Sequence, residues 1–438
     1  MLSIVLLAGG SSSRFVPLTD KNLFPFLGKT LVERQLQNFS KFSFDEFIVI
    51  GNPENKPAIE AEITKLGIKA KVMVQVGEGQ SGAVNTALAE VNMEGDLLVV
   101  NMNDVFEDSL LEKFNTLLPE LRSEKQNMLT GYKVSKYFPG GYLVHENGFV
   151  SKVVEKPGAG NEPSDYVRLV FDYFHSKQEL LANLKKASSS KDDVYETALT
   201  NMMGSGSKFR MLDYEGAWFT LKYPWHVLAM MEYFLGTIKG QTIADDVEVP
   251  DTARINGDVI IESGVKIFDG AVVNGPVYIG KNCILGNNAL VRGSNLGDNC
   301  VVGFSSEVAR SYFKSNVWLH MNYAGDSIID NNVSFGSTAI TANFRLDEAN
   351  ISVTVKGEKI DTGLTKLGNI IGPNVRIGVG TKLMPGVKIG AGSFIGSGLT
   401  LAQDVEANKF VDGKTELVVK DNKVDITSKS REHIKQNI

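Results

Sequence analysis

The sequence is poor in the features that mark several classes of protein. Its 438 residues include two cysteines, Cys283 and Cys300, which argues against a secreted disulfide framework and for a reducing compartment. No run of eighteen apolar residues and no charged-then-apolar leader is present, so no membrane partner is expected. With 45 Lys and Arg against 51 Asp and Glu, the chain lacks the charged blocks that nucleic acid would select, and no nucleic-acid partner is expected. We expect a cytoplasmic protein.

The second half of the chain contains a six-residue repeat. A length of 438 residues exceeds what one hydrophobic core usually organises, so two domains are expected. Most of the repeating aliphatic residues precede glycine or another turn-forming residue, and a weaker version of the spacing begins near Ile255. The spacing predicts a parallel β-helix over residues 245–405, wound as a left-handed prism. The clearest run comprises Ile371, Ile377, Leu383, Ile389, Ile395 and Leu401.

The repeat is expected to break between residues 310 and 370. This region contains the segments Trp318 to Ser327 and Thr341 to Asp347, which do not follow the period. A solenoid cannot specify chemistry by itself, and loops on a rigid scaffold often carry function. The alternative is a solenoid that serves only as a structural spacer. We place the candidate functional residues of this half in the break.

The first half of the chain, up to Leu235, has the alternating pattern of an α/β domain. Short apolar runs that read as buried strands alternate with segments of helical periodicity, which predicts βαβ units and a Rossmann-like sheet. The fold class is therefore α/β in the first half and β-helix in the second. The predicted strands are Leu2 to Leu7, Glu46 to Ile50, Val72 to Gln75 and Leu97 to Asn101, and the predicted helices are Leu31 to Asn38, Pro57 to Leu66, Gly82 to Val91 and Leu110 to Leu118.

A run of small residues follows the first predicted strand and ends in an arginine. Ala8, Gly9 and Gly10 lead through three serines to Arg14. Ligands of such sheets bind outside the carboxyl ends of the strands, where small residues let backbone N–H groups approach phosphate. A tight turn that needs positive φ explains a glycine pair about as often. The residues that follow decide between these two interpretations.

Those residues extend the run into a family signature. Pro17-Leu18-Thr19, Lys21 and the segment Leu23 to Lys29 follow it, and Gln75, Gly79-Gln80-Ser81-Gly82, Asn103-Asp104 and Glu155-Lys156-Pro157 come in family order. Together they resemble the sugar-phosphate nucleotidylyltransferases. Each residue alone is more simply an ordinary surface charge or turn residue, and their joint order favours a site.

The resemblance implies a role for each of these residues. Ala8, Gly9 and Gly10 would contact the nucleotide, and Gln75 and Gly79 would read its base. Arg14 and Lys21 would neutralise the triphosphate and the pyrophosphate leaving group, since phosphoryl transfer depends on positioned cations. Glu155 and Lys156 would bind the sugar and its phosphate, and Asp104 would ligate Mg²⁺.

Four positions depart from that signature. Ser12 stands in place of a glycine, and Asp20 in place of a proline. Thr220 occupies the position of a second metal-binding carboxylate, and a hydroxyl holds Mg²⁺ more weakly. The segment Val167 to Val170 lies where an asparagine and a glycine are usual, so the sugar is not identified from this half.

The second half resembles the acetyltransferase part of archaeal-type bifunctional enzymes, which acetylate an amino-sugar 1-phosphate and then nucleotidylate it. His320-x-x-Tyr323, Thr341-Ala342-Asn343 and Lys366-Leu367-Gly368 carry this resemblance. Acetyl transfer needs a base of near-neutral pKa, and His320 is the candidate. Tyr323 and Asn343 would orient the sugar, and Lys366 would contact acetyl-CoA, although a solvated loop lysine is an equally simple interpretation.

Four segments and one function follow from these patterns. We expect a nucleotidylyltransferase domain at 1–224, a connecting helix and linker at 225–244 whose apolar stripe packs between domains, a β-helix acetyltransferase domain at 245–405 and a polar tail at 406–438. The substrates would be glucosamine or galactosamine 1-phosphate, acetyl-CoA and UTP or dTTP, and the resemblance implies a homotrimer. Three alternatives stay open: a nucleotidylyltransferase with a purely structural β-helix, an acetyltransferase with a degenerate nucleotidyl site, and a non-catalytic sugar-nucleotide sensor.

Overall fold

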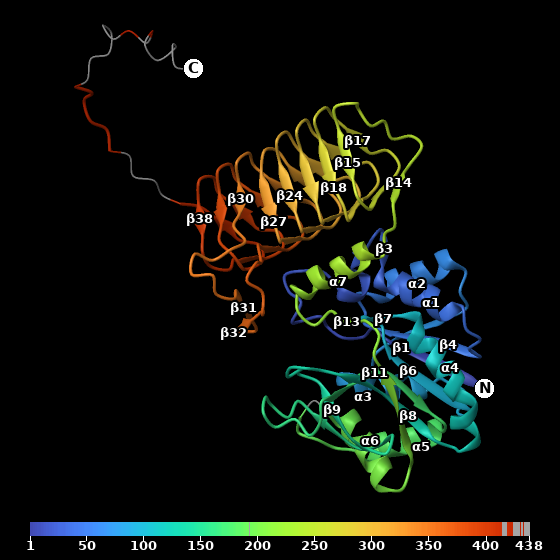
Figure 1. Ribbon diagram of the computed structural model, residues 1–438. Coiled ribbons are helices and arrows are strands. Elements are labelled where there is room, and N and C mark those ends of the chain that lie inside the picture. Colours follow the sequence, from blue (N-terminus) through green and yellow to red (C-terminus); the bar gives the residue numbers. More distant parts are fainter. Residues whose placement is uncertain (192, 414–417, 424–429, 431, 433–438) are drawn as a thin grey trace.

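The computed structural model describes residues 1–191, 193–413, 418–423, 430 and 432. An α/β domain and a long three-sided prism lie one on top of the other, with helix α7 between them (Figure 1). Much of the expected tail lies outside the described residues. In the part of the chain that the structure describes, no helix has both the length and the apolar character needed to cross a membrane.

A nine-stranded mixed sheet organises the α/β domain. Its strand order is β5-β4-β1-β6-β11-β8-β12-β10-β9, and β1, β4, β5 and β6 run parallel. The strands are β1 (Leu2–Leu7), β2 (Pro25–Phe26), β3 (Lys29–Thr30), β4 (Glu46–Gly51), β5 (Lys71–Val74), β6 (Asp96–Asn101), β7 (Asp104–Phe106), β8 (Asn127–Lys133), β9 (Gly141–Glu146), β10 (Phe149–Glu155), β11 (Tyr166–Phe174), β12 (Phe209–Tyr214) and β13 (Trp218–Thr220).

Helices cover the sheet and join its strands. They are η1 (Lys21–Leu23), α1 (Leu31–Ser40), α2 (Lys56–Leu66), α3 (Gly79–Leu88), α4 (Asp108–Ser123), α5 (Lys177–Lys186), α6 (Val194–Gly204) and α7 (His226–Gly236). Helix α1 begins where Thr30 accepts a hydrogen bond from the Glu33 N–H at 3.0 Å, and Glu33 also places a negative charge in the first turn. The four strands and four helices predicted for this half are present, with the largest shifts in their ends at α3 and α4.

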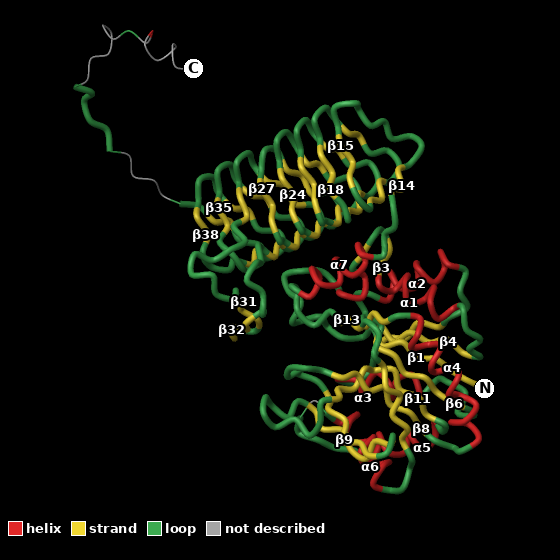
Figure 2. Tube along the Cα trace, viewed as in Figure 1, coloured by secondary structure: helices red, strands yellow, loops and turns green. Residues whose placement is uncertain are grey.

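The prism consists of three parallel sheets of eight strands each. We call them the domain-facing sheet (β14-β16-β19-β22-β25-β28-β33-β36), the second sheet (β15-β18-β21-β24-β27-β30-β35-β38) and the third sheet (β17-β20-β23-β26-β29-β34-β37-β39). Figure 2 shows them as ladders of short strands separated by turns. Successive coils stack Val, Ile and Leu side chains into one interior column, so the predicted left-handed β-helix is confirmed.

The prism strands are short. They are β14 (Gln241–Ile243), β15 (Arg254–Asn256), β16 (Val259–Ile261), β17 (Lys266–Ile267), β18 (Val272–Asn274), β19 (Val277–Ile279), β20 (Ile284–Leu285), β21 (Leu290–Arg292), β22 (Asn295–Leu296), β23 (Val301–Val302), β24 (Glu307–Ala309), β25 (Tyr312–Phe313), β26 (Val317–Leu319), β27 (Tyr323–Gly325), β28 (Ile328–Ile329), β29 (Val333–Phe335), β30 (Ile340–Thr341), β33 (Ile370–Ile371), β34 (Arg376–Ile377), β35 (Lys382–Leu383), β36 (Lys388–Ile389), β37 (Phe394–Ile395), β38 (Thr400–Leu401) and β39 (Phe410–Val411).

The expected break over residues 310–370 is wrong for its first half. Strands β25 to β30 continue the stack in register through Thr341, and the departure is confined to the segment that carries the hairpin β31 (Ser352–Val355) and β32 (Glu358–Asp361). The coil from Tyr312 to its partner Ile328 is shorter than the regular coil from Val259 to Val277. A shortened coil keeps its strand pairing but moves aliphatic residues off the six-residue spacing.

One edge of the prism is a column of residues with left-handed backbone. Glycine and asparagine tolerate positive φ at the lowest cost, and these two residue types occupy the edge. Asn332 also donates to Asn374 at 2.7 Å, so neighbouring coils are tied at the corner. The column comprises Gly264, Asn282, Asn299, Asn316, Asn332, Asn374, Gly392 and Asn408.

The outward side of the domain-facing sheet is buried against the α/β domain. Aromatic and aliphatic side chains fill this interface, with Phe24 stacked on Tyr312 at 4.8 Å between ring centroids. Helix α7, which begins one residue after the expected start of the connecting segment, packs its apolar side here as predicted. The shared cluster includes Phe15, Leu18, Phe24, Phe26, Trp225, Met230, Phe234, Tyr278, Tyr312, Ile328, Ile351, Val353 and Ile370.

Candidate functional site

The loop after β1 is built around the carbonyl of Ala8. The side-chain amides of Asn22 and Asn55 donate to this oxygen at 3.2 and 2.9 Å. Asp20, which departs from the family signature, accepts from the Asn22 N–H at 2.7 Å and from Asn55 Nδ2 at 2.9 Å. Asp20 therefore accepts from both of the residues whose amides hold the Ala8 carbonyl, and it supports the loop.

Gly9 and Ser12 occupy two positions of this loop that suit glycine for different reasons, a close contact at Gly9 and a positive φ at Ser12. A Cβ at Gly9 would collide with the side chain of Gln75, so glycine permits the close approach of loop and side chain. Gln75 Nε2 in turn donates to the carbonyls of Gly77 and Gly79 at 3.1 and 2.9 Å. Ser12 has φ of 51°, a conformation that glycine adopts without strain, and its buried hydroxyl has no hydrogen-bond partner. The structure thus places Gly9, Gln75 and Gly79 side by side.

Asp104 lies at the centre of the predicted phosphate site. It is 2% exposed, and its Oδ1 has no hydrogen-bond partner. Burial raises the pKa of Asp104 to about 6, against the opposing effects of Thr220, Lys21 and Asn101. Burial also lowers the pKa of Lys21, with Asp104 acting in the opposite direction. The two residues therefore lie close enough to influence each other.

Thr220 faces Asp104 directly across the antiparallel pair of β7 and β13. Asn103 Nδ2 donates to its hydroxyl at 3.0 Å. The structure thus brings one carboxylate and one hydroxyl face to face at the predicted metal site.

Glu155 and Lys156 leave the end of β10 as an ion pair. Lys156 Nζ lies 2.6 Å from Glu155 Oε1, and the Lys156 N–H donates to the Gly140 carbonyl at 3.0 Å. Lys156 has φ of 44°, a strained conformation for a lysine that is common at functional positions. Both residues affect the pKa of Lys222, as do Arg14 and Lys21 from the loop after β1, so the structure brings three segments to one place.

Arg168 fills the region where the sugar was expected to be read. It is buried and donates to Glu196 Oε1 at 2.7 Å and to Gln80 Oε1 at 2.8 Å, and it lies 3.4 Å from Asp172 Oδ2. Burial raises the pKa of Asp172 to about 7. Arg168 is thus neutralised within the protein, which limits its availability to a ligand.

The second candidate site lies at the corner between the second and domain-facing sheets of the prism. Asn343 Nδ2 donates to Tyr323 Oη at 3.2 Å and to the carboxylate of Asp326. Arg310 binds the same carboxylate through two bonds of 2.7 Å. Arg310 and Asp326 have φ of 48° and 46° at an edge where glycines of the preceding coils also have positive φ. Strained non-glycine residues of this kind mark functional sites more often than plain turns.

His320 and Lys366 lie at the margins of this cluster. His320 is exposed just after β26, at the end of the second sheet's strand β27 that lies away from Asp326. Its backbone N–H donates to Asn322 Oδ1 at 2.6 Å. Lys366 is exposed and pairs with Phe344 through an isolated β-bridge, next to Asn343. The structure therefore joins Tyr323 and Asn343 directly, with Lys366 beside them and His320 at the other corner of the same sheet.

Comparison with known proteins gives a family for this arrangement. The nucleotidyl transferase family model matches residues 3–220, and the bacterial transferase hexapeptide model matches residues 258–293 and 370–403. The "Bifunctional protein GlmU" of Methanococcus vannielii is 31% identical over 433 residues, covering 96% of this chain and 99% of that protein. The "Bifunctional sugar-1-phosphate nucleotidylyltransferase/acetyltransferase" of Sulfurisphaera tokodaii is 31% identical over 412 residues, covering 92% and 98%.

The chain is a member of the bifunctional sugar-1-phosphate nucleotidylyltransferase/acetyltransferase family. The predicted resemblance is confirmed over nearly the whole length, and the chain is a transferase enzyme.

The donor set of this family member fits Mg²⁺ that arrives with a nucleotide. Mg²⁺ commonly uses one or two protein carboxylates and completes its six ligands with phosphate oxygens and water. Asp104 offers one unpartnered buried oxygen, and the Thr220 hydroxyl is opposite. In the described part of the chain, no group of three or more His, Cys, Asp or Glu side chains is arranged to hold a metal. The protein alone therefore supplies a minimal metal site.

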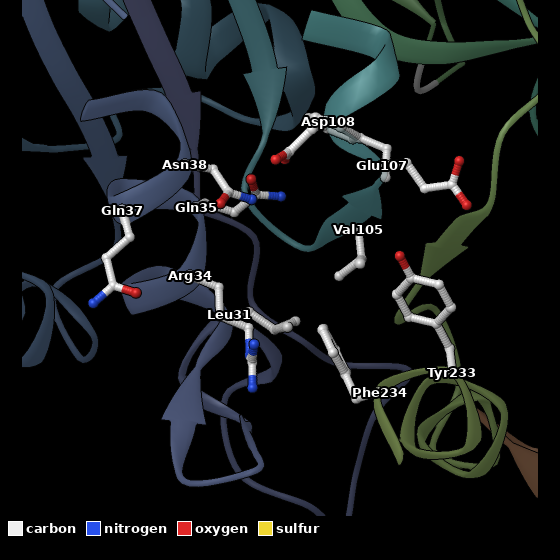
Figure 3. Close-up of a pocket in the computed structure, with 11 residues that line it drawn as sticks. Leu31, Arg34, Gln35, Gln37, Asn38, Val105, Glu107, Asp108, Tyr233 and Phe234 are labelled. Carbon is white, nitrogen blue, oxygen red and sulfur yellow. The ribbon is translucent and has the colours of Figure 1, made fainter. Parts of the chain in front are cut away.

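A cavity of this bifunctional enzyme is separate from the predicted site residues. It measures about 400 Å³ and lies between α1, the β7–α4 segment and α7, where Figure 3 shows Arg34, Glu107, Asp108 and Tyr233 around it. Gln35 on its wall donates to the Asp104 carbonyl. The cavity is therefore behind the strand that presents Asp104, and its lining includes none of the predicted site residues.

One residue beside the predicted nucleotidyl site was missed by reasoning from sequence. Lys222 lies just after β13, and burial lowers its pKa to about 8, with further lowering by Arg14 and Lys156. No family motif quoted above includes it. The only hint in the sequence was that Lys222 lies close to several aromatic residues, and this pattern is too common to identify a site.

Proposed function

We propose that the chain first acetylates the amine of a hexosamine 1-phosphate at the prism and then joins the product to a nucleoside monophosphate in the α/β domain. The observation that carries this proposal is a cluster of cations: Lys21 acts on the buried carboxylate of Asp104, and Arg14, Lys21 and Lys156 all act on Lys222, which follows the strand paired with Asp104. Such an excess of positive charge is suited to two phosphorylated substrates. Glucosamine or galactosamine 1-phosphate, acetyl-CoA, and UTP or dTTP are the proposed substrates, and UTP is the preferred nucleotide.

In the nucleotidyl reaction, a phosphate oxygen of the sugar 1-phosphate attacks the α-phosphorus of the triphosphate. A new P–O bond forms, the bond to the β-phosphate breaks, and pyrophosphate leaves with its electron pair. Arg14 and Lys21 would stabilise the charge of the triphosphate and of pyrophosphate, and Lys156 would hold the attacking phosphate. Glu155 would bind a sugar hydroxyl, Ala8, Gly9 and Gly10 would contact the nucleotide, and Gln75 and Gly79 would read the base.

Asp104 would hold Mg²⁺, with Thr220 facing it, and the ion would supply charge neutralisation for the phosphates. The same Asp104 carboxylate also attracts Lys21. Occupation of the site by a cation would therefore stabilise the ionised form of Asp104, whose burial otherwise favours the protonated form.

In the acetyl reaction, the sugar amine attacks the thioester carbonyl of acetyl-CoA. The C–N bond forms, the C–S bond breaks, and the coenzyme leaves as its thiol. His320 would take the proton from the amine, while Tyr323 and Asn343 would orient the sugar and Lys366 would contact the acyl donor. The hydrogen bond between Asn343 and Tyr323 supports the orienting role, since it fixes two side chains on the sheet that His320 adjoins.

We also propose that the chain forms a homotrimer through the prism. Trp318, Phe394 and Phe410 are 56%, 49% and 71% exposed on the third sheet, and apolar residues exposed in this way favour an interface. Light scattering after size-exclusion chromatography would measure the mass, and a monomer would contradict the proposal. The expected cytoplasmic location stays a prediction.

The deciding experiment follows two products separately. Purified protein would receive Mg²⁺, glucosamine 1-phosphate, acetyl-CoA and UTP or dTTP, and free thiol and pyrophosphate would be measured in parallel. Control reactions would use N-acetylglucosamine 1-phosphate without acetyl-CoA. Both products are expected.

Thiol without pyrophosphate, even from the acetylated sugar, would favour an acetyltransferase with a degenerate nucleotidyl site, for which Thr220 opposite Asp104 is the specific observation. Pyrophosphate without thiol would favour a nucleotidylyltransferase with a structural β-helix. Nucleotide binding with neither product would favour a sensor.

A further inference from the structure

Lys222 is held at the edge of the nucleotidyl site by contacts that leave part of its ammonium group free. Its Nζ donates to the Pro139 carbonyl at 2.5 Å. It also lies 5.7 Å from the ring centroid of Phe138 and 6.0 Å from that of Tyr223. An ammonium has three donors, and one carbonyl satisfies one of them, so a further acceptor can be accommodated.

The backbone around Lys222 fixes its position relative to Asp104. Thr220, which closely precedes it, is paired with Asp104 in the β7–β13 ladder. His226 Nδ1 lies 2.9 Å from the Thr220 carbonyl oxygen, which secures the turn between β13 and α7. Lys222 therefore lies just beyond the end of β13, the strand that presents the Thr220 hydroxyl to Asp104.

The charges that act on Lys222 are mostly positive. Arg14 and Lys21 act on it from the loop after β1 and Lys156 from the end of β10, and Glu155 is the opposing charge. Glu155 is already paired with Lys156 at 2.6 Å. Among the described residues, the ion pairs of the chain include no carboxylate partner for Lys222, Arg14 or Lys21. Lys21 and Lys222 are partly buried, have no carboxylate in an ion pair with them in the described part of the chain and lie beside further positive charge. Cations in this situation favour a bound anion.

We propose that Lys222 binds a phosphate oxygen in the nucleotidyl site, and thereby supplies positive charge on the side of Asp104 where Thr220 has replaced a carboxylate. The proposal rests on the proposed nucleotidyl function and adds a contact residue to it. The phosphate belongs either to the triphosphate or to the sugar 1-phosphate, because both bring the same chemistry to Lys156 and Arg14. With a hydroxyl at Thr220 and an ammonium at Lys222, this side of the site depends less on a protein-held cation for positive charge.

Three variants of the full chain test this contact. Lys222→Met keeps the length and apolar contacts of the side chain with Phe138 and Tyr223 but removes the charge. Lys222→Arg keeps the charge and the stacking on aromatic rings. Lys113→Met is the matched control, since Lys113 Nζ also donates to a backbone carbonyl, that of Asp213 at 3.0 Å, on α4. Calorimetric titration with UTP and, in a separate arm, with N-acetylglucosamine 1-phosphate measures binding without turnover.

We expect Lys222→Met to weaken one of the two ligands by about 10- to 100-fold, as for the loss of a charge-assisted contact. The arm that weakens identifies the phosphate that Lys222 binds. Lys222→Arg should stay within about threefold of the parent, and Lys113→Met should bind both ligands normally. Unchanged affinities in both arms for a folded Lys222→Met protein would overturn the proposal.

Failure of the proposed function is distinguishable from failure of the Lys222 contact. If the parent binds UTP or the sugar phosphate but releases no pyrophosphate, nucleotidyl transfer fails while the titrations still decide the role of Lys222. If the parent binds neither ligand, the phosphate contact is overturned as well.

Discussion

The buried ion pair between Asp330 and Lys314 ties the signature loop of the α/β domain to the prism. Asp330 Oδ2 accepts from the N–H and hydroxyl of Thr19 at 2.8 and 2.9 Å, and Asp330 Oδ1 lies 3.3 Å from Lys314 Nζ. Lys314 also donates to the Thr19 hydroxyl at 2.7 Å. Thr19 lies between Arg14 and Lys21, so this contact positions the segment that carries both proposed phosphate-binding cations.

Asp330→Asn is expected to lower the stability of the chain by about 2–3 kcal/mol, somewhat less than the roughly 3–5 kcal/mol that removing one partner of a fully buried pair costs. The Asp330 side chain is fully buried, but that of Lys314 keeps 19% exposure, which reduces the cost of leaving its charge unpaired. The oxygen of the introduced amide can still accept from Thr19. At about 2–4 °C per kcal/mol for a domain of this size, the melting temperature should fall by roughly 5–10 °C.

Scanning calorimetry of the full chain checks this value against a matched control. Asp404→Asn removes the partner of Lys388 at 3.5 Å, a pair that is more exposed, with 16% and 36% of the two side chains accessible. Such a pair contributes at most about 1 kcal/mol. The double variant Asp330→Asn, Lys314→Met should recover part of the loss, since no unpaired cation remains. Equal shifts for the Asp330 and Asp404 variants, or strictly additive effects of the Asp330 and Lys314 substitutions, would refute the reasoning.

Three further predictions concern the two sites. Gly9→Ala should weaken UTP binding at least tenfold in calorimetric titration, because the new Cβ meets Gln75, and normal affinity would contradict the close approach. Burial raises the pKa of Asp104 to about 6, so the parent loses stability as the pH rises from about 4 to about 6. In melting experiments at several pH values, Asp104→Asn should be up to about 3 kcal/mol more stable than the parent at pH 7.5 and equally stable below pH 4. A gain that does not vary with pH would exclude this cause. His320→Asn should abolish thiol release and spare pyrophosphate release from N-acetylglucosamine 1-phosphate, whereas retained thiol release would remove His320 as the base.

Sequence patterns predicted the strands of the α/β domain better than its helices. Leu2–Leu7 has the predicted bounds because a continuous apolar run ends at small residues, and its burial is complete along its length. Helix α3 begins at Gly79, ahead of the predicted start at Gly82, since its first turn is Gly-Gln-Ser and has no apolar period. Propensity alone gave no signal there, and tertiary contacts determine the start.

The shortened coils explain why part of the prism was mistaken for a break. The six-residue spacing requires three equal repeats in every coil, and it is lost where Tyr312 pairs with Ile328 after a shorter coil. The turn residues Arg310 and Asp326 were not predicted either. Both adopt positive φ at an edge of the prism where Gly293 has positive φ in an earlier coil, and neither residue type alone identifies such a turn in sequence. Contacts of this kind depend on stacking between coils and have no local pattern in sequence.

Site residues were predicted where they belong to a short sequence motif. They were missed where their position depends on a contact with a residue distant in sequence. Gln75 and Gly79 were expected near the glycine loop and lie beside Gly9. Lys222 was missed because its anchor, the Pro139 carbonyl, is distant in sequence. Asp20 was treated as a departure from the signature, yet it binds Asn22 and Asn55 and supports the loop.

The segment that carries the hairpin β31–β32 is an insertion that the prism accommodates without a change in the pairing of its strands. Ile328 and Ile370 are direct neighbours in the domain-facing sheet although the whole hairpin segment lies between them along the chain, whereas an ordinary coil joins Ile370 to its next partner, Lys388. The extra chain leaves the stack and returns to the same register, so its length does not affect the coils above and below. An insertion at this position can therefore differ in length without changing the pitch of the prism, whereas its residues Ile351 and Val353 are held by their packing against the α/β domain.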